Sequence, residues 1–136
     1  MKLQEKKSIK KGSNLNKNNI LIVDDDTELN EGLTELLKNE GYAVCSVNNG
    51  LEALKEAGCQ TFDLIILDYK MEGMSGLEVL IKLKKTIPKV KVIFISGNPF
   101  IEKIVGKYDL SENILCALSK PFNIEIFLDA VKKACR

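Results

Sequence analysis

The chain has 136 residues, of which 45% are hydrophobic and 29% charged, and it carries 20 basic against 19 acidic side chains. These values are typical of one globular domain, and no apolar run approaches the roughly 20 residues that a membrane-spanning helix needs. The amino-terminal segment is too polar to hold the apolar core of a signal peptide, so we expect a cytoplasmic protein. The chain contains no histidine, which excludes Ser-His and Cys-His catalysis, histidine-ligated zinc and a phosphohistidine of its own.

Residues 1–18 differ in charge from the rest of the chain. They hold six lysines and one glutamate, a net charge of +5, whereas residues 19–136 hold 14 basic and 18 acidic side chains, a net charge of −4. A basic arm of this kind can bind nucleic acid or an acidic surface. Because the segment lacks aromatic residues, arginine and helical periodicity, we favour a disordered tail or linker. One domain is then expected over 19–136.

From residue 19 onward, short apolar strands alternate with amphipathic helices. Strands are expected over 19–24, 42–47, 63–67, 90–95 and 114–118. Helices are expected after the first strand up to Gly41, over 51–57, from the cap Ser75 to Pro88, within 100–108, and from about Asn123. Strands that alternate with helices in this way predict an α/β fold, with a parallel sheet covered by helices on both faces.

Polar side chains stand at the ends of four of these strands. Asp24 and Asp25 end the first strand, Asp68 the third, Ser96 the fourth and Lys120 the fifth. Because the carboxyl ends of parallel strands meet at one edge of the sheet, we expect these side chains to lie together. Three carboxylates without a cation repel one another, whereas Mg²⁺ prefers one or two carboxylates together with phosphate oxygens. With Lys120 and Ser96 as further phosphate contacts, the set suits in-line phosphoryl transfer onto an acid.

These residues belong to four motifs, which occur in the order ILIVDDD, LIILDYKMEGMSGLEVL, VIFISG and LSKPF. In these motifs the chain resembles the receiver domain of bacterial two-component response regulators, over about residues 19–135. The resemblance implies a flavodoxin-like (βα)5 three-layer sandwich, with a five-stranded parallel sheet in the order 2-1-3-4-5. It also implies a phosphoryl donor on another polypeptide, a sensor histidine kinase or a histidine phosphotransfer protein, and Mg²⁺ (or Mn²⁺) as the cofactor.

Carried over motif by motif, the resemblance assigns the acceptor and the metal ligands. It implies Asp68 as the phosphoacceptor. The metal ligands are then Asp24, Asp25 and Asp68, together with the backbone carbonyl of Lys70. A receiver catalyses only its own phosphorylation and dephosphorylation, so we do not expect an enzyme that acts on other substrates.

The resemblance also assigns the switch residues. Ser96 corresponds to the switch hydroxyl and Lys120 to the phosphate-binding lysine, with Pro121 after a peptide bond that is usually cis in the family. Ala117 stands where the family normally has tyrosine or phenylalanine, and rotation of that ring reports phosphorylation to the surface. A methyl group cannot do this. The expected phosphorylation chemistry is therefore complete, while the output relay is altered.

Other departures from the family pattern lie near the acceptor and in the fifth strand. Glu72 and Ser75 occupy positions usually held by proline and aspartate, and Asn113-Ile114 replace the usual Gly-Ala pair. Lys70 places a long cationic side chain where it can shield an acyl phosphate from water. Our hypothesis is a comparatively long-lived phosphorylated form.

Two alternatives stay open at this point. Asp24 begins an imperfect match to the D-x-D-x-T motif of haloacid-dehalogenase-like phosphatases, but this interpretation leaves Asp68 unexplained and the chain is short for such an enzyme. The other alternative is a pseudo-receiver that only binds partners.

Because no effector segment follows Arg136, we expect output through a protein target or an effector domain on another chain, without direct DNA binding or membrane contact. A stand-alone regulator is slightly favoured over a receiver of a hybrid kinase or longer regulator, because the chain begins with methionine.

Overall fold

The computed structural model describes residues 18–97 and 109–135. It contains a five-stranded parallel sheet in the order β2-β1-β3-β4-β5, which confirms the expected α/β fold and strand order. The strands are β1 (Asn19–Val23), β2 (Ala43–Val47), β3 (Leu64–Asp68), β4 (Val92–Ser96) and β5 (Ile114–Ser119). The helices are α1 (Thr27–Asn39), α2 (Gly50–Cys59), α3 (Gly76–Thr86) and α5 (Ile124–Ala134).

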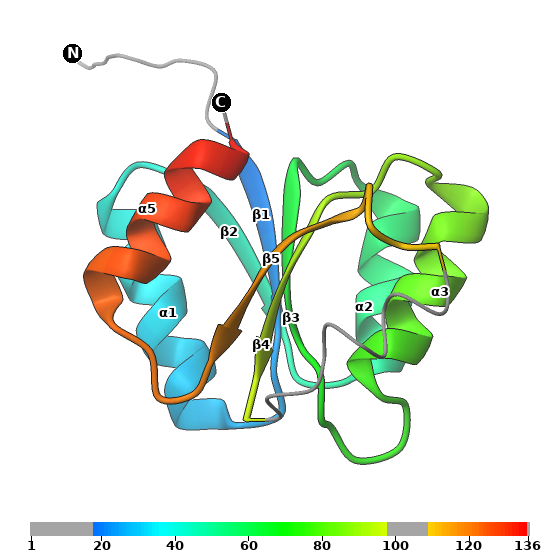
Figure 1. Ribbon diagram of the computed structural model, residues 1–136, viewed down its shortest axis with the longest axis horizontal. Coiled ribbons are helices and arrows are strands. Elements are labelled where there is room, and N and C mark those ends of the chain that lie inside the picture. The colour runs from blue at the N-terminus through cyan, green and yellow to red at the C-terminus, as the bar shows by residue number, and fades with distance from the viewer. Residues whose placement is uncertain (1–17, 98–108, 136) are drawn as a thin grey trace, which may run out of the picture.

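The helices form two layers around the sheet. Figure 1 shows α1 and α5 on one face and α2 and α3 on the other. The helix predicted within 100–108 lies outside the described residues, as does the tail predicted over 1–18, apart from residue 18. Within the described part of the chain, no helix is long and apolar enough to cross a membrane.

The three central strands are apolar except for one polar residue at an end of each, because both of their faces are covered. Successive residues of a strand point to opposite faces, so a strand between two helix layers has no solvent side. Towards α2 and α3 lie Leu21, Val23, Ile65, Leu67, Val92 and Phe94. Towards α1 and α5 lie Ile20, Ile22, Leu64, Ile66, Ile93 and Ile95. All twelve are at most 1% exposed, which explains the continuous apolar runs in the sequence.

Each of the four described helices begins with a capping side chain that accepts hydrogen bonds from backbone N–H groups of its first turn. Asp26 caps α1, Ser75 caps α3 as predicted, and Asn49 and Asn123 cap α2 and α5. At α3 the cap is reciprocal, because the Glu78 side chain accepts a hydrogen bond from the backbone N–H of Ser75. Such caps typically contribute about 1 kcal/mol each. They end the loops that follow β1, β2, β3 and β5 at defined points.

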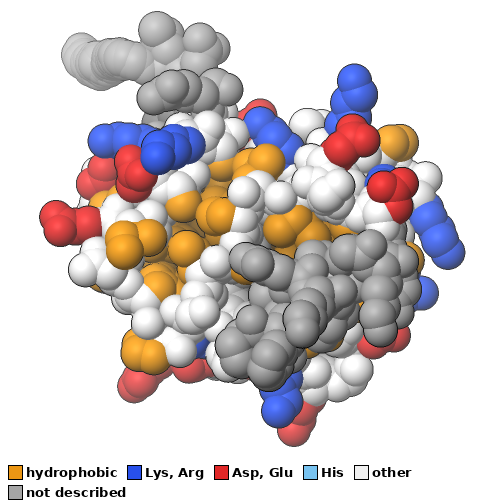
Figure 2. Space-filling model, in the orientation of Figure 1, with side chains coloured by type: hydrophobic (Ala, Val, Ile, Leu, Met, Phe, Trp, Pro, Cys, Tyr) orange, Lys and Arg blue, Asp and Glu red, His pale blue; other side chains and the backbone are white. Residues whose placement is uncertain are grey.

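The edge strand β5 leaves apolar side chains at the surface. Its register with β4 shifts between Val92 and Ile93, which leaves Leu115 without a pairing position, and Leu115 is 42% exposed. The sequence did not predict this irregularity. A groove beside Leu115 is also lined by Leu118, Ile126 and Ala130, and Figure 2 shows the apolar surface over this part of the molecule. The groove shares no residue with the acidic strand ends described next.

Candidate functional site

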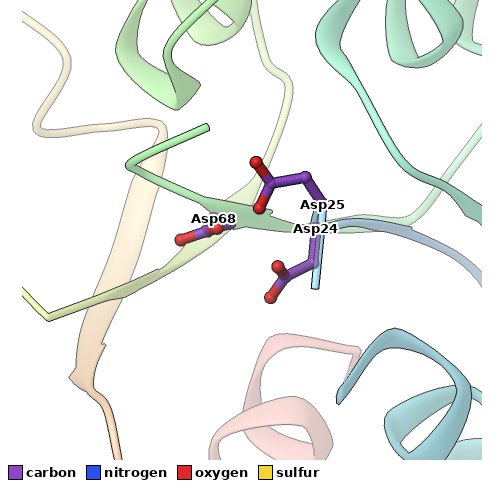
Figure 3. A group of neighbouring side chains, drawn as sticks. All are labelled: Asp24, Asp25 and Asp68. Atoms are coloured by element: carbon purple, nitrogen blue, oxygen red, sulfur yellow. The ribbon is translucent and has the colours of Figure 1, made fainter. Parts of the chain in front are cut away.

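The carboxyl ends of β1 and β3 bring three acidic side chains together. Asp24 and Asp25 follow β1, and Asp68 is the last residue of β3. One carboxylate oxygen from each lies within 4.8 Å of the other two, and Figure 3 shows the three side chains gathered at these strand ends. Asp24 and Asp68 are buried, with exposed fractions of 0% and 3%, whereas Asp25 is exposed. The predicted convergence of these three acids is therefore present in the structure.

Lys120 reaches the same cluster from the end of β5. Its Nζ lies 3.2 Å from Oδ2 of Asp24 and 3.4 Å from Oδ1 of Asp68. Its backbone N–H donates to the carbonyl of Ser96 at 2.9 Å, which joins the ends of β4 and β5. The Lys120–Pro121 peptide bond is cis, as the resemblance implies. One cation thus lies between two buried carboxylates.

The electrostatics of the cluster shift the pKa values of two groups. Burial of the Asp68 carboxyl, together with the negative charge of Asp24, raises the pKa of Asp68 from 3.8 to about 6, against the opposing effect of Lys120. Burial alone would lower the pKa of Lys120, but the charges of Asp24 and Asp68 outweigh it and raise that pKa above its ordinary value. Burial and the neighbouring carboxyl group thus disfavour the charged form of Asp68, and the Lys120 ammonium offsets part of this effect.

The donor set fits a hard divalent cation. Oδ2 of Asp24 is buried and accepts no hydrogen bond, so within the described structure its neighbour is the Lys120 ammonium. Three carboxylates against one lysine leave an excess of negative charge, which an oxygen-binding ion such as Mg²⁺ would neutralise. Lys70 is exposed two residues beyond Asp68, and the role of its carbonyl as a ligand stays a prediction.

Ser96 and Ala117, the two predicted switch residues, lie on neighbouring strands. Ser96 ends β4 and is 1% exposed. Ala117 lies in β5 opposite Phe94 of β4 and packs against the core on the α2 and α3 side of the sheet. The position that carries an aromatic ring in the family therefore holds a half-buried methyl group here.

Sequence reasoning missed Gly76, which sets the distance between α3 and the acidic site. The backbone N–H of Gly76 donates to the carbonyl of Tyr69 at 2.7 Å. A Cβ at this position would collide with the backbone oxygen of Asp68 and would lie 2.9 Å from the Cα of Tyr69. Only glycine fits this close approach, and the signal in the sequence was a glycine directly after the cap Ser75. Asn30 and Asn48, whose amides contact Asp24, were also missed.

The strand order, the acidic ends of β1 and β3 and the lysine after β5 together define a receiver-type signalling domain. The family described as the response regulator receiver domain matches residues 20–132, and the chain belongs to this family. This confirms the resemblance recognised in the four motifs.

Curated relatives support the same assignment. The chain is 36% identical over 114 residues to sporulation initiation phosphotransferase F of Bacillus subtilis, and this match covers 84% of the chain and 90% of that protein. It is also 36% identical over 122 residues to the uncharacterized transcriptional regulatory protein YkoG of Bacillus subtilis, covering 90% of the chain. The chain spans about half the length of YkoG, 53%, and half of a CpxR homolog of Haemophilus influenzae, 50%.

Solved structures share the fold at moderate sequence identity. A CheY-like receiver domain protein from Methanospirillum hungatei has a TM-score of 0.79 and 31% identity, covering 88% of this chain and 94% of that one. The response regulator TrrA from Thermotoga maritima, solved in complex with Mg²⁺-BeF, has a TM-score of 0.75 and 34% identity, covering 86% of this chain and 98% of that one.

Proposed function

We propose that Asp68 accepts a phosphoryl group from a phosphohistidine on a partner protein, a sensor histidine kinase or a histidine phosphotransfer protein. The single observation that carries this proposal is the position of the Asp68 carboxylate. It is almost fully buried, shares a cluster with Asp24 and Asp25, and lies 3.4 Å from the Lys120 ammonium. Asp68 can therefore act as the nucleophile at a point where Asp24 and Asp25 offer oxygens to a metal ion. Lys120 offers a positive charge to the phosphoryl group at the same point.

In this reaction a carboxylate oxygen of Asp68 forms a bond to phosphorus while the bond from phosphorus to the partner's imidazole nitrogen breaks. The electron pair of that bond stays on the imidazole. Asp24, Asp25, Asp68 and the carbonyl of Lys70 would hold Mg²⁺ or Mn²⁺, which when bound offsets the charge of the carboxylates and of the phosphoryl oxygens. Lys120 binds a phosphoryl oxygen as a point charge, and the Ser96 hydroxyl donates to another.

The proposed output is contact with a downstream protein or with an effector domain on another chain, without direct DNA binding. The chain's only catalytic activity is then its own phosphorylation and dephosphorylation. A cytoplasmic kinase as donor would place the domain in the cytoplasm. Because Ala117 cannot act as an aromatic reporter, the altered surface in the phosphorylated form must arise elsewhere, through Ser96 and the strand ends that it joins.

Incubation with acetyl phosphate and Mg²⁺, followed by mapping of the phosphorylated residue by mass spectrometry, tests the proposal. We expect one phosphoryl group on Asp68, loss of labelling in Asp68→Asn, and normal labelling in the control Asp129→Asn, which changes an exposed aspartate on α5. Label on Asp24 would instead support the haloacid-dehalogenase-like phosphatase. Absence of Mg²⁺-dependent labelling in the wild type would support the pseudo-receiver. The comparisons with known proteins lend no support to either alternative.

A further inference from the structure

Asn30 is a polar residue on the apolar side of α1. It is 3% exposed and lies in line with the buried Leu33 and Leu37, three and seven residues further along the helix. Its side-chain nitrogen donates to the backbone carbonyl of Asp24 at 3.0 Å and to that of Val47 at 2.8 Å. Both protons of this amide group are therefore used on main-chain oxygens at the ends of β1 and β2.

The orientation of the Asn30 amide is fixed by its surroundings. The Thr34 hydroxyl donates to the backbone carbonyl of Asn30 at 2.7 Å and lies 3.4 Å from its side-chain oxygen. Rotation of the amide by half a turn would place that oxygen against the two carbonyls of Asp24 and Val47, where no proton is available. Only the observed orientation therefore lets this side chain donate to both carbonyls.

The main chain of Asp24 is held from several directions. Its N–H donates to the carbonyl of Val47 at 3.2 Å, and its carbonyl accepts from Asn30 and from the side chain of Asn48, the latter at 3.3 Å. One of its carboxylate oxygens accepts from the backbone N–H of Asp26 at 2.9 Å. Asp24 lies just beyond the end of β1, where pairing within the sheet ends, so side-chain amides supply the partners that its buried carbonyl needs.

We propose that Asn30 is a positioning residue of the acidic site. Its amide joins the main chain of Asp24 to the end of β2 by hydrogen bonds. The Asp24 carboxylate therefore stays beside Asp68, although the two negative charges repel each other. A site held in place before the cation arrives binds it more tightly, because binding then costs no rearrangement of the ligands. This inference rests on the proposed function, since it concerns metal binding at that site.

The test is a Mg²⁺ titration without any phosphoryl donor, followed through the backbone amide NMR signals of the loops after β1 and β3. Asn30→Leu keeps the size of the side chain and removes both donors. We expect Mg²⁺ affinity to fall by about tenfold, the lower end of the range for residues that orient metal ligands. The control Leu33→Ala lowers stability on the same face of α1 without touching Asp24, and its Mg²⁺ affinity should equal that of the wild type.

A second variant provides the test if Asn30→Leu does not fold. Asn48 is exposed, so Asn48→Ala should fold normally while it loses the longer hydrogen bond to the Asp24 carbonyl, and its affinity should fall by a few-fold. If Asn30→Leu folds and binds Mg²⁺ with wild-type affinity, the positioning role of these amides is overturned. If Asn30→Leu does not fold, wild-type Mg²⁺ affinity in Asn48→Ala overturns it. Either result leaves the proposed function standing. A wild type that binds no Mg²⁺ would overturn both.

Discussion

Tyr69 lies edge-on to Phe94, with ring centroids 6.0 Å apart and an angle of 71° between the ring planes. Tyr69 directly follows Asp68, and Phe94 is the β4 neighbour of Ala117. The aromatic ring that the family normally carries in β5 is absent, and a fully buried phenylalanine lies on the adjacent strand instead. This pair therefore connects the residue after the proposed acceptor with β4, the strand next to the one that carries the altered position.

We expect Phe94→Ala to destabilise the domain by about 3–5 kcal/mol, because it opens a cavity in the core on the α2 and α3 side of the sheet. Tyr69→Phe keeps the ring and should change the free energy of unfolding by no more than about 0.5 kcal/mol. Urea unfolding followed by circular dichroism measures both values. A loss below about 1 kcal/mol for Phe94→Ala would show that the neighbouring side chains collapse into the space.

Gly76→Ala should be destabilising although alanine normally favours helices. The added Cβ collides with the backbone of Asp68 and Tyr69, and overpacking of this kind typically costs about 1–3 kcal/mol. Gly32→Ala is the matched control, because Gly32 lies in α1 with nothing within 4 Å of the added Cβ, and it should gain about 0.5–1 kcal/mol. Thermal unfolding of both variants checks the contrast. Equal effects at the two positions would contradict the close approach at Gly76.

The raised pKa of Asp68 predicts a pH dependence of stability in the absence of metal. The folded-state pKa is about 6 against an ordinary value of 3.8, so the folded protein binds more protons than the unfolded chain between these values. The contribution of Asp68 to stability is then most favourable at low pH and is lost as pH rises through about 6. Asp68→Asn removes this titration.

We therefore expect the free energy of unfolding of Asp68→Asn, measured in urea, to rise relative to that of the wild type from about pH 4 to pH 7. Addition of Mg²⁺ should stabilise the wild type more at pH 7 than at pH 5, because the ion needs the ionised carboxylate. A stability difference that is independent of pH over this range would contradict the raised pKa.

Lys120→Met should have opposite effects on Mg²⁺ affinity, which rises, and on the rate of phosphorylation, which falls. The ammonium lies 3.2 Å from Asp24 and 3.4 Å from Asp68 and repels an incoming cation, so its removal should tighten Mg²⁺ binding by roughly tenfold near pH 8. Phosphorylation by acetyl phosphate should become slower, because the phosphoryl oxygens lose a positive partner. Calorimetric titration and rates of labelling measure the two effects. The control is Lys133→Met, which breaks an exposed lysine–aspartate pair on α5 and should change neither.

The sequence predicted the layout of this site because the layout follows from parallel strands. The buried run that ends at Asp68 was recognisable as a central strand, and the polar residues that end the other strands then had to lie at the same edge. The observed strand bounds differ from the predicted ones by at most two residues. The distances within the cluster and the raised pKa of Asp68 could not be predicted, since both depend on how β1, β3 and β5 sit relative to one another.

Two further features escaped prediction for identifiable reasons. Leu115 loses its pairing position because of the register between β4 and β5, which the sequence of a single strand does not specify. Asparagine is a polar residue that is expected on the solvent-facing side of a helix, yet Asn30 lies on the same face of α1 as the buried leucines. A polar residue at an apolar position of a helical pattern was the signal, and it marked a buried hydrogen-bonding role.

Lys70→Asn tests the hypothesis of a long-lived phosphorylated form. Lys70 is exposed two residues beyond Asp68, where its aliphatic chain can hinder the approach of water to the acyl phosphate while its ammonium attracts the phosphoryl oxygens. Shortening it to asparagine should accelerate spontaneous dephosphorylation by on the order of a few-fold, because water exclusion is reduced. The decay of Asp68 phosphorylation after removal of acetyl phosphate measures the rate. Lys82→Asn, an exposed lysine on α3, is the control, and identical decay in the wild type and Lys70→Asn would refute the shielding role.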